Sequence, residues 1–425
     1  MTAPIPLAPR LTAARRVALA SLVAAAIAAP AAACQLLAGI EPVDQVPAST
    51  TGSTADSGST DAAHDAPAQA DAAPDAPAFD PCGASTAFPE SPPASAFPGN
   101  IDITTVMRRA FLGSSAVPDA VAPLVCRASS FDLDGVYTCK GPKDVGSPAG
   151  SPCAAYKPST QNTCDLAEGR DNATTALLVA SVEQVGHEPS WLDGRIEKGE
   201  LGMMFQIASY NGEPDDDHVS VTVLLLFGPE RDADGGVDGG EDAAPPSWQP
   251  SDRWAVNGAS CKDPATCKVP TFTGTGYVRD QWLYASLDDL GLPIMVEYVR
   301  LVVPAKGARL TAHLAPPGDA GGWAMDHARL AGRVQTTAMA EQFGSIEVNG
   351  KPLCEQPLAL PMIRDAVCRY ADLPLDALDA PDAATICSAL SFSLGFFTVP
   401  GRRGRVIDPG PPSTACAGAA IATCY

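Results

Sequence analysis

Positively charged residues are scarce in this chain of 425 residues. Lys and Arg number 28 against 49 Asp and Glu, the formal net charge is −21, and no Lys or Arg lies between Val17 and Met107. A protein that binds a nucleic-acid backbone needs a face of clustered basic side chains. The composition therefore argues against nucleic acid as a partner, and the acidity is typical of a surface that keeps a protein soluble.

Catalytic signatures are missing as well. The chain has no G-x-S-x-G nucleophile elbow, no H-E-x-x-H zinc motif, no phosphate-binding G-x-x-x-x-G-K and no dinucleotide-binding glycine pattern. Histidine adjoins an acidic residue in three places: His187–Glu188, Asp217–His218 and Asp326–His327. Adjacent side chains on a strand point to opposite faces, so these pairs are not expected to form a base and its orienting carboxylate. We therefore assign no catalytic residue, and a triad assembled from distant residues stays open.

The cysteine pattern lacks the paired C-x-x-C spacing of zinc ribbons and thiol oxidoreductases, yet the chain holds 13 cysteines. Setting Cys34 aside leaves an even set, which in an exported chain is typical of a disulfide framework. We expect Cys261 to pair with Cys267 and Cys416 with Cys424, because each pair closes a short loop that keeps two thiols close together. The partners of the other cysteines stay undetermined.

The first 33 residues have the layout of an export signal. Arg10, Arg15 and Arg16 precede an apolar segment that starts at Val17, and small residues lead to Cys34. The segment "AAAC" resembles a lipobox, which implies a lipid-modified Cys34 and a membrane anchor, although Ala31 stands where the pattern prefers Leu. The alternative is a secretory signal cut after an A-x-A site, with Cys34 as a disulfide partner. Gln35 is not the aspartate that resembles an inner-membrane retention signal, which favours the outer membrane.

The rest of the chain divides by composition. Residues 34–99 are rich in Ala, Pro, Ser and Asp and predict a disordered tether, because such a segment buries too little apolar surface to offset its conformational entropy. We expect a Cys-rich acidic entry segment over 100–172, a β-sandwich over 173–343 and a helical, disulfide-stapled region over 344–425. The expected fold class is mainly β.

Alternating apolar residues carry the sandwich prediction. In the segment 199–212, Met203, Phe205 and Ile207 share one face before an Asn-Gly turn, and the segment 218–228 alternates in the same way, which predicts a hairpin. Further strands are expected at 281–287, 294–303 and 308–315. Several short strands without intervening helices favour an antiparallel sandwich. Helical spacing is expected over 323–344, with short helices over 358–373 and 382–392.

Two acidic segments suggest a calcium site. The first, "FDLDG", carries alternating aspartates, and the second, "CDLAEGRDN", crowds further oxygen ligands between cysteines. The candidate ligands are Asp132, Asp134, Asp165, Glu168, Asp171 and Asn172. Disulfides among Cys126, Cys139, Cys153 and Cys164 would bring these carboxylates together, and calcium suits six to eight oxygen ligands. The alternative is that Asp and Asn serve turns and that Arg170 pairs with a neighbouring carboxylate.

The segments "FDLDGVYTC", "CDLAEGRDNA", "YNGEPDDDHVSV" and "CSALSFSLGF" together make the chain similar to uncharacterised, tethered lipoproteins of high-GC Gram-negative bacteria. That resemblance implies an exported and anchored protein and no particular reaction.

Two functions compete for this chain. The first is a non-catalytic binding or structural module for an envelope glycan or protein, in which a tryptophan stacks on sugar rings; the candidates are Trp191, Trp248, Trp254, Trp282 and Trp323. The second is an envelope glycan hydrolase that uses carboxylates on the sandwich face, with candidates Asp215, Asp216 and Asp217.

Overall fold

The computed structural model describes part of the chain. The described residues are 80–83, 87–94, 99–112, 121–126, 130–134, 153–154, 156, 165, 170–177, 191–230, 245–296, 299–318, 321–348, 351–356, 359–376, 382–409, 416 and 424. The predicted signal segment, Cys34 and most of the predicted tether lie outside these residues, as do Cys139, Cys164 and Glu168.

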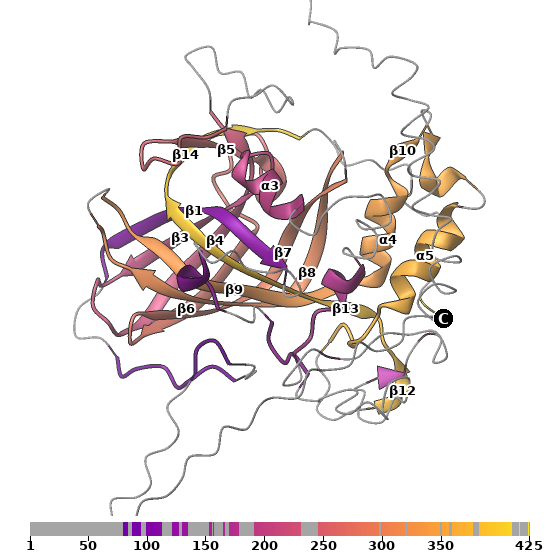
Figure 1. Cartoon of the computed structure of the whole chain (residues 1–425), viewed down its shortest axis with the longest axis horizontal. Helices are drawn as coiled ribbons and strands as arrows, with labels where there is room; N and C mark the ends of the chain where they lie inside the picture. Colours follow the sequence, from indigo (N-terminus) through magenta and orange to yellow (C-terminus); the bar gives the residue numbers. More distant parts are fainter. Residues whose placement is uncertain are drawn as a thin grey trace, which may run out of the picture.

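Eight antiparallel strands close into a β-barrel, so the prediction of a sandwich is wrong (Figure 1). Around the barrel the order is β4, β3, β1, β13, β9, β8, β7 and β6, and β6 pairs again with β4. The bounds are β1 Ile101–Leu112, β3 Met203–Tyr210, β4 Asp216–Pro229, β6 Phe272–Arg279, β7 Trp282–Val296, β8 Val299–Ala315, β9 Ala324–Gln335 and β13 Ala389–Pro400. An alternating sequence shows that one face is buried, but it leaves open whether the last strand pairs with the first.

Closure depends on β4, which pairs on both of its edges. Val223 lies opposite Phe205 of β3 on one side and opposite Phe272 of β6 on the other. The barrel also includes β1 and β13, which lie outside the range 173–343 that was predicted for the sandwich. Side chains from all eight strands form one apolar core, in which the rings of Phe205 and Phe396 stack with their centroids 5.0 Å apart. An eight-stranded barrel has an interior just wide enough for such side chains.

The predicted hairpin of β3 and β4 is confirmed. Met203 pairs with Leu225 and Ile207 with Val221 in antiparallel register, and Met203, Phe205 and Ile207 are buried in the barrel core. The predicted strands 281–287 and 308–315 lie in β7 and β8. The run 294–303 is not one strand, because it is divided between the end of β7 and the start of β8.

Helices are few, and two of the regions predicted to be helical form strands in whole or in part. The region 323–344 forms β9 and then a short helix, α4 Thr336–Gly344, because Met325 and Leu330 face a barrel core that extends along the sheet. The region 382–392 forms β12 Asp382–Ile386 and the start of β13. The helix expected at 358–373 is confirmed as α5 Ala359–Arg369, and α4 and α5 lie side by side in Figure 1.

Smaller elements complete the described fold. They are η1 Ala122–Leu124, β2 Cys153–Ala154, α3 Trp191–Glu197, β5 Arg253–Asn257, η3 Gly258–Ser260, β10 Glu347–Val348, β11 Lys351–Pro352, η4 Leu353–Glu355 and β14 Arg402–Ile407. β5 pairs with the end of β4 and β14 lies parallel to β5, so these two strands extend the sheet beyond the barrel. None of the described helices is long and apolar enough to cross a membrane.

Five disulfides join described residues: Cys82–Cys126, Cys153–Cys387, Cys261–Cys267, Cys354–Cys416 and Cys368–Cys424. The predicted bridge Cys261–Cys267 is therefore present, and Cys416–Cys424 is wrong. Cys416 instead pairs with Cys354 of η4 and Cys424 with Cys368 of α5, so each C-terminal cysteine is bonded to a residue far away in the chain. Bridges in this number indicate an oxidising, extracytoplasmic compartment.

Candidate functional site

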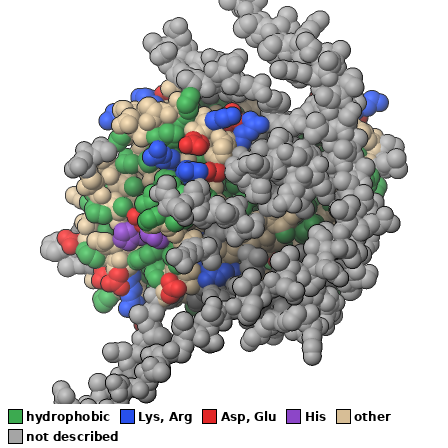
Figure 2. Space-filling view, in the orientation of Figure 1, with side chains coloured by type: hydrophobic (Ala, Val, Ile, Leu, Met, Phe, Trp, Pro, Cys, Tyr) green, Lys and Arg blue, Asp and Glu red, His purple; other side chains and the backbone are tan. Residues whose placement is uncertain are grey.

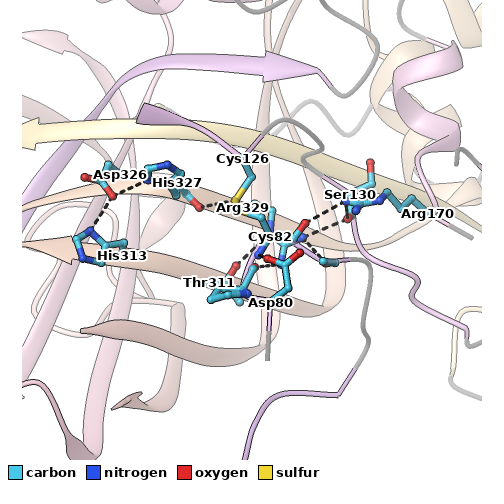
Figure 3. Close-up of a disulfide and its surroundings, with 12 residues drawn as sticks. Asp80, Cys82, Cys126, Ser130, Arg170, Thr311, His313, Asp326, His327 and Arg329 are labelled. Atoms are coloured by element: carbon cyan, nitrogen blue, oxygen red, sulfur yellow. Dashed lines mark hydrogen bonds and ion pairs between the residues drawn. A yellow bond between two sulfur atoms is a disulfide. The ribbon is translucent and has the colours of Figure 1, made fainter. Parts of the chain in front are cut away.

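Residues 80–83, which belong to the predicted tether, lie on the outer wall of β8 and β9. Arg329 of β9 is 1% exposed and donates to the carbonyl oxygen of Gly83 at 2.8 Å and to that of Pro81 (Figure 3). The Cys82–Cys126 bridge lies beside this contact. Burial lowers the pKa of Arg329, and the positive charge of Arg170 is the second cause. The carbonyls compensate for the lost water, and the chain is held at this wall from Asp80 onward.

The same wall carries residues 130–134, the first acidic segment. The Arg329 guanidinium lies 4.0 Å from the ring centroid of Phe131, and Arg333 donates to the carbonyl oxygen of Leu133 at 2.7 Å. Phe131 and Leu133 are buried against Ala331 of β9. Because side chains alternate along the segment, these two apolar anchors leave Asp132 and Asp134 on the other side.

The second acidic segment joins the first through its backbone. The Asp171 amide donates to the Phe131 carbonyl oxygen at 2.8 Å, and the Leu133 amide donates to Asp171 Oδ2. One carboxylate oxygen from each of Asp132, Asp134 and Asp171 lies within 4.8 Å of the others. We call these three residues the acidic cluster. Disulfides among the four nearby cysteines were expected to join the segments, but Cys126 pairs with Cys82 and Cys153 with Cys387.

Asp171 is the buried member of the acidic cluster. It is 1% exposed, and its Oδ1 atom has no hydrogen-bond partner, whereas Asp132 and Asp134 are half-buried. Burial raises the pKa of Asp171 well above its usual range, and the negative charge of Asp372 acts in the same direction. Asp134 and Asp165 contribute further, in smaller measure.

The remaining predicted ligands do not join the cluster in the same way. Asp165 influences the pKa of Asp171 but lies outside the group of three. Asn172 is excluded because its side chain holds β13: its Oδ1 accepts from the Ser393 amide at 3.1 Å and from Thr175 Oγ1 at 2.6 Å. Glu168 lies outside the described residues.

A second polar group lies near one end of β7, β8 and β9, and sequence reasoning missed it. Asp326 Oδ1 lies 2.9 Å from Nδ1 of His313 and 2.9 Å from Nδ1 of His327 (Figure 3). An ionised carboxylate only accepts hydrogen bonds, so both imidazoles donate from Nδ1. The Gln281 side-chain oxygen lies 3.3 Å from His313 Nε2. The Trp282 ring lies 5.6 Å from the His313 ring and 6.0 Å from the His327 ring, between centroids. We call Trp282, His313, Asp326 and His327 the histidine cluster.

The prediction that Asp326 and His327 point apart is wrong. His327 has a φ of +48°, in the left-handed region, and the pairing of β8 with β9 is irregular between Thr311 and His313. This local distortion breaks the alternation on which the prediction relied, so the two adjacent side chains meet. A signal was available in the sequence: a hairpin with its turn near Gly318 brings His313 opposite Asp326.

The other candidates have structural roles. Asp216 accepts from the amides of Asn211 at 2.7 Å and His218 at 3.0 Å, and Asp215 accepts from the Asp280 amide at 2.9 Å. Asp217 is half-buried beside them. Asp215 and Asp216 therefore fix turns at this end of the barrel through these hydrogen bonds.

Two of the described tryptophans lie beside polar side chains: Trp282 contacts the histidine rings, and Trp248 lies 6.0 Å from the Arg108 guanidinium. Trp254 is 2% exposed, and Trp248 packs on it with ring centroids 5.0 Å apart. Trp323 meets Tyr210 edge to face at 5.3 Å. Trp191 begins α3, and its side chain lies outside what the structure describes.

Comparisons with protein families, curated proteins and solved structures give no match to this chain.

Proposed function

We propose that this protein is an exported, lipid-anchored envelope protein whose barrel is a non-catalytic binding module for an envelope glycan. The histidine cluster carries the proposal. The Trp282 indole offers an apolar face for the C–H groups of a sugar ring, and the neighbouring imidazoles and amide offer hydrogen bonds to its hydroxyls. Histidine side chains reach the surface beside hydrophobic ones on the face in Figure 2.

The geometry also favours binding because the polar groups are already oriented. Asp326 holds both imidazoles through Nδ1, which leaves Nε2 of His327 directed away from the carboxylate. A ligand that meets oriented groups does not have to restrict them, so less binding free energy is lost to ordering. Half-burial of these side chains keeps them accessible while limiting their motion.

An anchor on Cys34 fits this function. An extracytoplasmic compartment, the export-like first 33 residues and the following tether support attachment to the outer membrane by acyl chains on Cys34. Mass spectrometry of the mature N-terminus tests the anchor: a diacylglyceryl-modified Cys34 is expected. An unmodified terminus, or one at another residue, would contradict it.

The hydrolase alternative has less support. Two of the three carboxylates proposed for it, Asp215 and Asp216, already accept backbone hydrogen bonds that fix turns, which leaves them poorly placed to act as acid and nucleophile. The barrel interior is filled by apolar side chains. These observations favour recognition over hydrolysis.

The test is binding of the full-length mature protein, in detergent and with its disulfides intact, to an array of bacterial envelope glycans. We expect retention on at least one glycan and a tenfold or greater loss for Trp282→Ala. Trp323→Ala is the matched control, since Trp323 is also a half-buried tryptophan but packs on Tyr210.

Three outcomes would contradict the proposal. Binding to no glycan on the array would exclude this class of ligand and would leave an envelope protein as the alternative partner. Equal binding by Trp282→Ala and the wild type would remove the site. Release of new reducing ends from a bound glycan would favour the hydrolase.

A further inference from the structure

We infer that the acidic cluster of Asp132, Asp134 and Asp171 binds a calcium ion. The inference rests on two observations: three carboxylates converge within 4.8 Å, and the buried one, Asp171, has an Oδ1 atom without a hydrogen-bond partner. It does not depend on the proposed glycan binding.

Buried acceptors without partners are costly. Asp171 is 1% exposed, so bulk solvent has almost no access to its carboxylate. Its Oδ2 atom accepts from the Leu133 amide, but no group of the described chain donates to Oδ1. Nearly all buried polar atoms in proteins have partners, so an orphaned carboxylate oxygen indicates an absent ligand. A cation, a proton or a buried water molecule would satisfy this oxygen, and the convergence of two further carboxylates on it favours the cation.

Charged side chains of both signs lie around the buried Asp171 carboxylate. Asp134, Asp165 and Asp372 all act on Asp171 as like charges. Arg309 of β8 lies near Asp132, and Arg333 of β9 lies near Asp372. Arg333 donates to the Leu133 carbonyl oxygen and Arg170 to that of Ser130 at 3.3 Å, so these cations fix the backbone of the acidic segment.

The spacing of the oxygens fits calcium. Calcium–oxygen distances are about 2.3–2.6 Å, so oxygens on opposite sides of one ion lie up to about 5 Å apart. The oxygens of the acidic cluster lie within 4.8 Å of one another, so one calcium ion can reach all three. Magnesium demands near-ideal octahedral geometry and usually keeps several of its waters, so it is less suited to three converging carboxylates. Zinc prefers nitrogen and sulfur, and the described cysteines near this site are in disulfides.

A bound ion would fasten two segments to the barrel. Residues 130–134 and 170–172 come from distant parts of the chain. They meet through the Asp171–Phe131 backbone hydrogen bond, the Leu133 amide on Asp171 Oδ2 and Arg170 on the Ser130 carbonyl oxygen. Ligands from both segments would join them through the ion. The remaining coordination positions are available to water, and Asp165 is a further carboxylate that acts on Asp171.

The experiment uses the full-length mature protein with its disulfides, first dialysed against EDTA. Thermal unfolding and titration calorimetry are then recorded with calcium chloride, and separately with magnesium chloride. We expect millimolar calcium to raise the midpoint by a few degrees, with a smaller effect of magnesium, because a ligand bound only by the folded state stabilises it.

Variants locate the site. Asp132→Asn and Asp171→Asn are expected to weaken calcium binding at least tenfold and to abolish the midpoint shift, whereas Asp289→Asn, an exposed residue of β7, should respond as the wild type does. Asp132 is half-buried, so its variant decides the matter if Asp171→Asn fails to fold.

Two results would overturn the inference. The first is a wild-type midpoint and calorimetric trace that calcium leaves unchanged, which would indicate a proton or a buried water molecule at Asp171. The second is an unchanged calcium response in both cluster variants. Glycan binding is measured in calcium and in EDTA, so failure of this site and failure of the glycan site are distinguishable.

Discussion

Asp372 is a buried carboxyl group outside the acidic cluster, and its surroundings make its charge costly. Its Oδ1 atom accepts from the Ser391 amide at 2.8 Å, and its Oδ2 atom bonds with Ser391 Oγ. Burial raises the pKa of Asp372 from 3.8 to about 6, although the hydrogen bonds to Ser391 oppose that change. The folded state therefore binds a proton more tightly than the unfolded state does.

This predicts a pH-dependent effect of Asp372→Asn. Because the folded-state pKa is raised, wild-type stability falls as pH rises from about 4 to about 6, and the cost is fully present above that range. Asn has the shape of the protonated acid and no charge. The variant should equal the wild type near pH 4 and exceed it at pH 7 by up to about 3 kcal/mol.

Urea unfolding in EDTA between pH 4 and pH 8 measures this difference. Asp289→Asn, on an exposed residue, should show no such trend. A difference between Asp372→Asn and the wild type that is constant across this range would contradict the prediction.

The turn between β3 and β4 and the turn between β6 and β7 differ in how well their residues suit the backbone conformation. In the β3–β4 connection Gly212 has a φ of +85°, and a Cβ there would lie 2.7 Å from Ile101 Cδ1. Between β6 and β7, Asp280 and Gln281 have φ values of +52° and +66°, and they connect the paired residues Arg279 and Trp282. Such a two-residue turn favours Gly at its second position.

Substitutions at these turns should have opposite effects. Gln281→Gly should stabilise the protein by up to about 0.5 kcal/mol. Gly removes the cost of a side chain on a left-handed backbone, and it loses part of that gain to entropy and to the lost contact with His313. Gly212→Ala should destabilise it by about 1–2 kcal/mol or more, since strain and a clash combine. Urea midpoints at unchanged m-value measure both; a shift of the same sign for the two would contradict this account.

At the scale of the whole molecule, disulfides tie the outer segments to the barrel. Cys153–Cys387 spans 234 residues and connects β2 with the residue after β12, whereas Cys261–Cys267 spans only 6. A cross-link stabilises mainly by restricting the unfolded chain, so the longer loop restricts more.

Replacing both cysteines of a bridge by Ser should therefore lower the free energy of unfolding by a different amount for each bridge. The chain-entropy relation predicts about 5 kcal/mol for Cys153→Ser with Cys387→Ser, and about 2 kcal/mol for Cys261→Ser with Cys267→Ser. Urea unfolding of the oxidised proteins provides the comparison. Equal losses would show that native packing at the two sites, and not loop length, sets their contribution.

Sequence reasoning succeeded where a feature depends on neighbouring residues. Alternation identified the buried faces of β3 and β4, and a short loop identified the bridge Cys261–Cys267. It failed for Cys416 and Cys424, whose partners lie far away in the chain, and for β9, where apolar residues fit a helical spacing as well as a strand. A local sequence pattern contains no information about the core against which an element packs.

The amino-acid sequence is sufficient to predict a mainly β, acidic chain with many disulfides, and it predicts that the carboxylates of two acidic segments converge on a cation. The tertiary structure is needed to show that the sheet closes into a barrel, and that Asp132, Asp134 and Asp171 meet while the Asn172 side chain bonds to β13. It also decided that His313, Asp326 and His327 form one group. The reason is physical: hydrophobic periodicity specifies which side of a strand is buried, whereas closure and convergence depend on contacts between residues far apart in the chain.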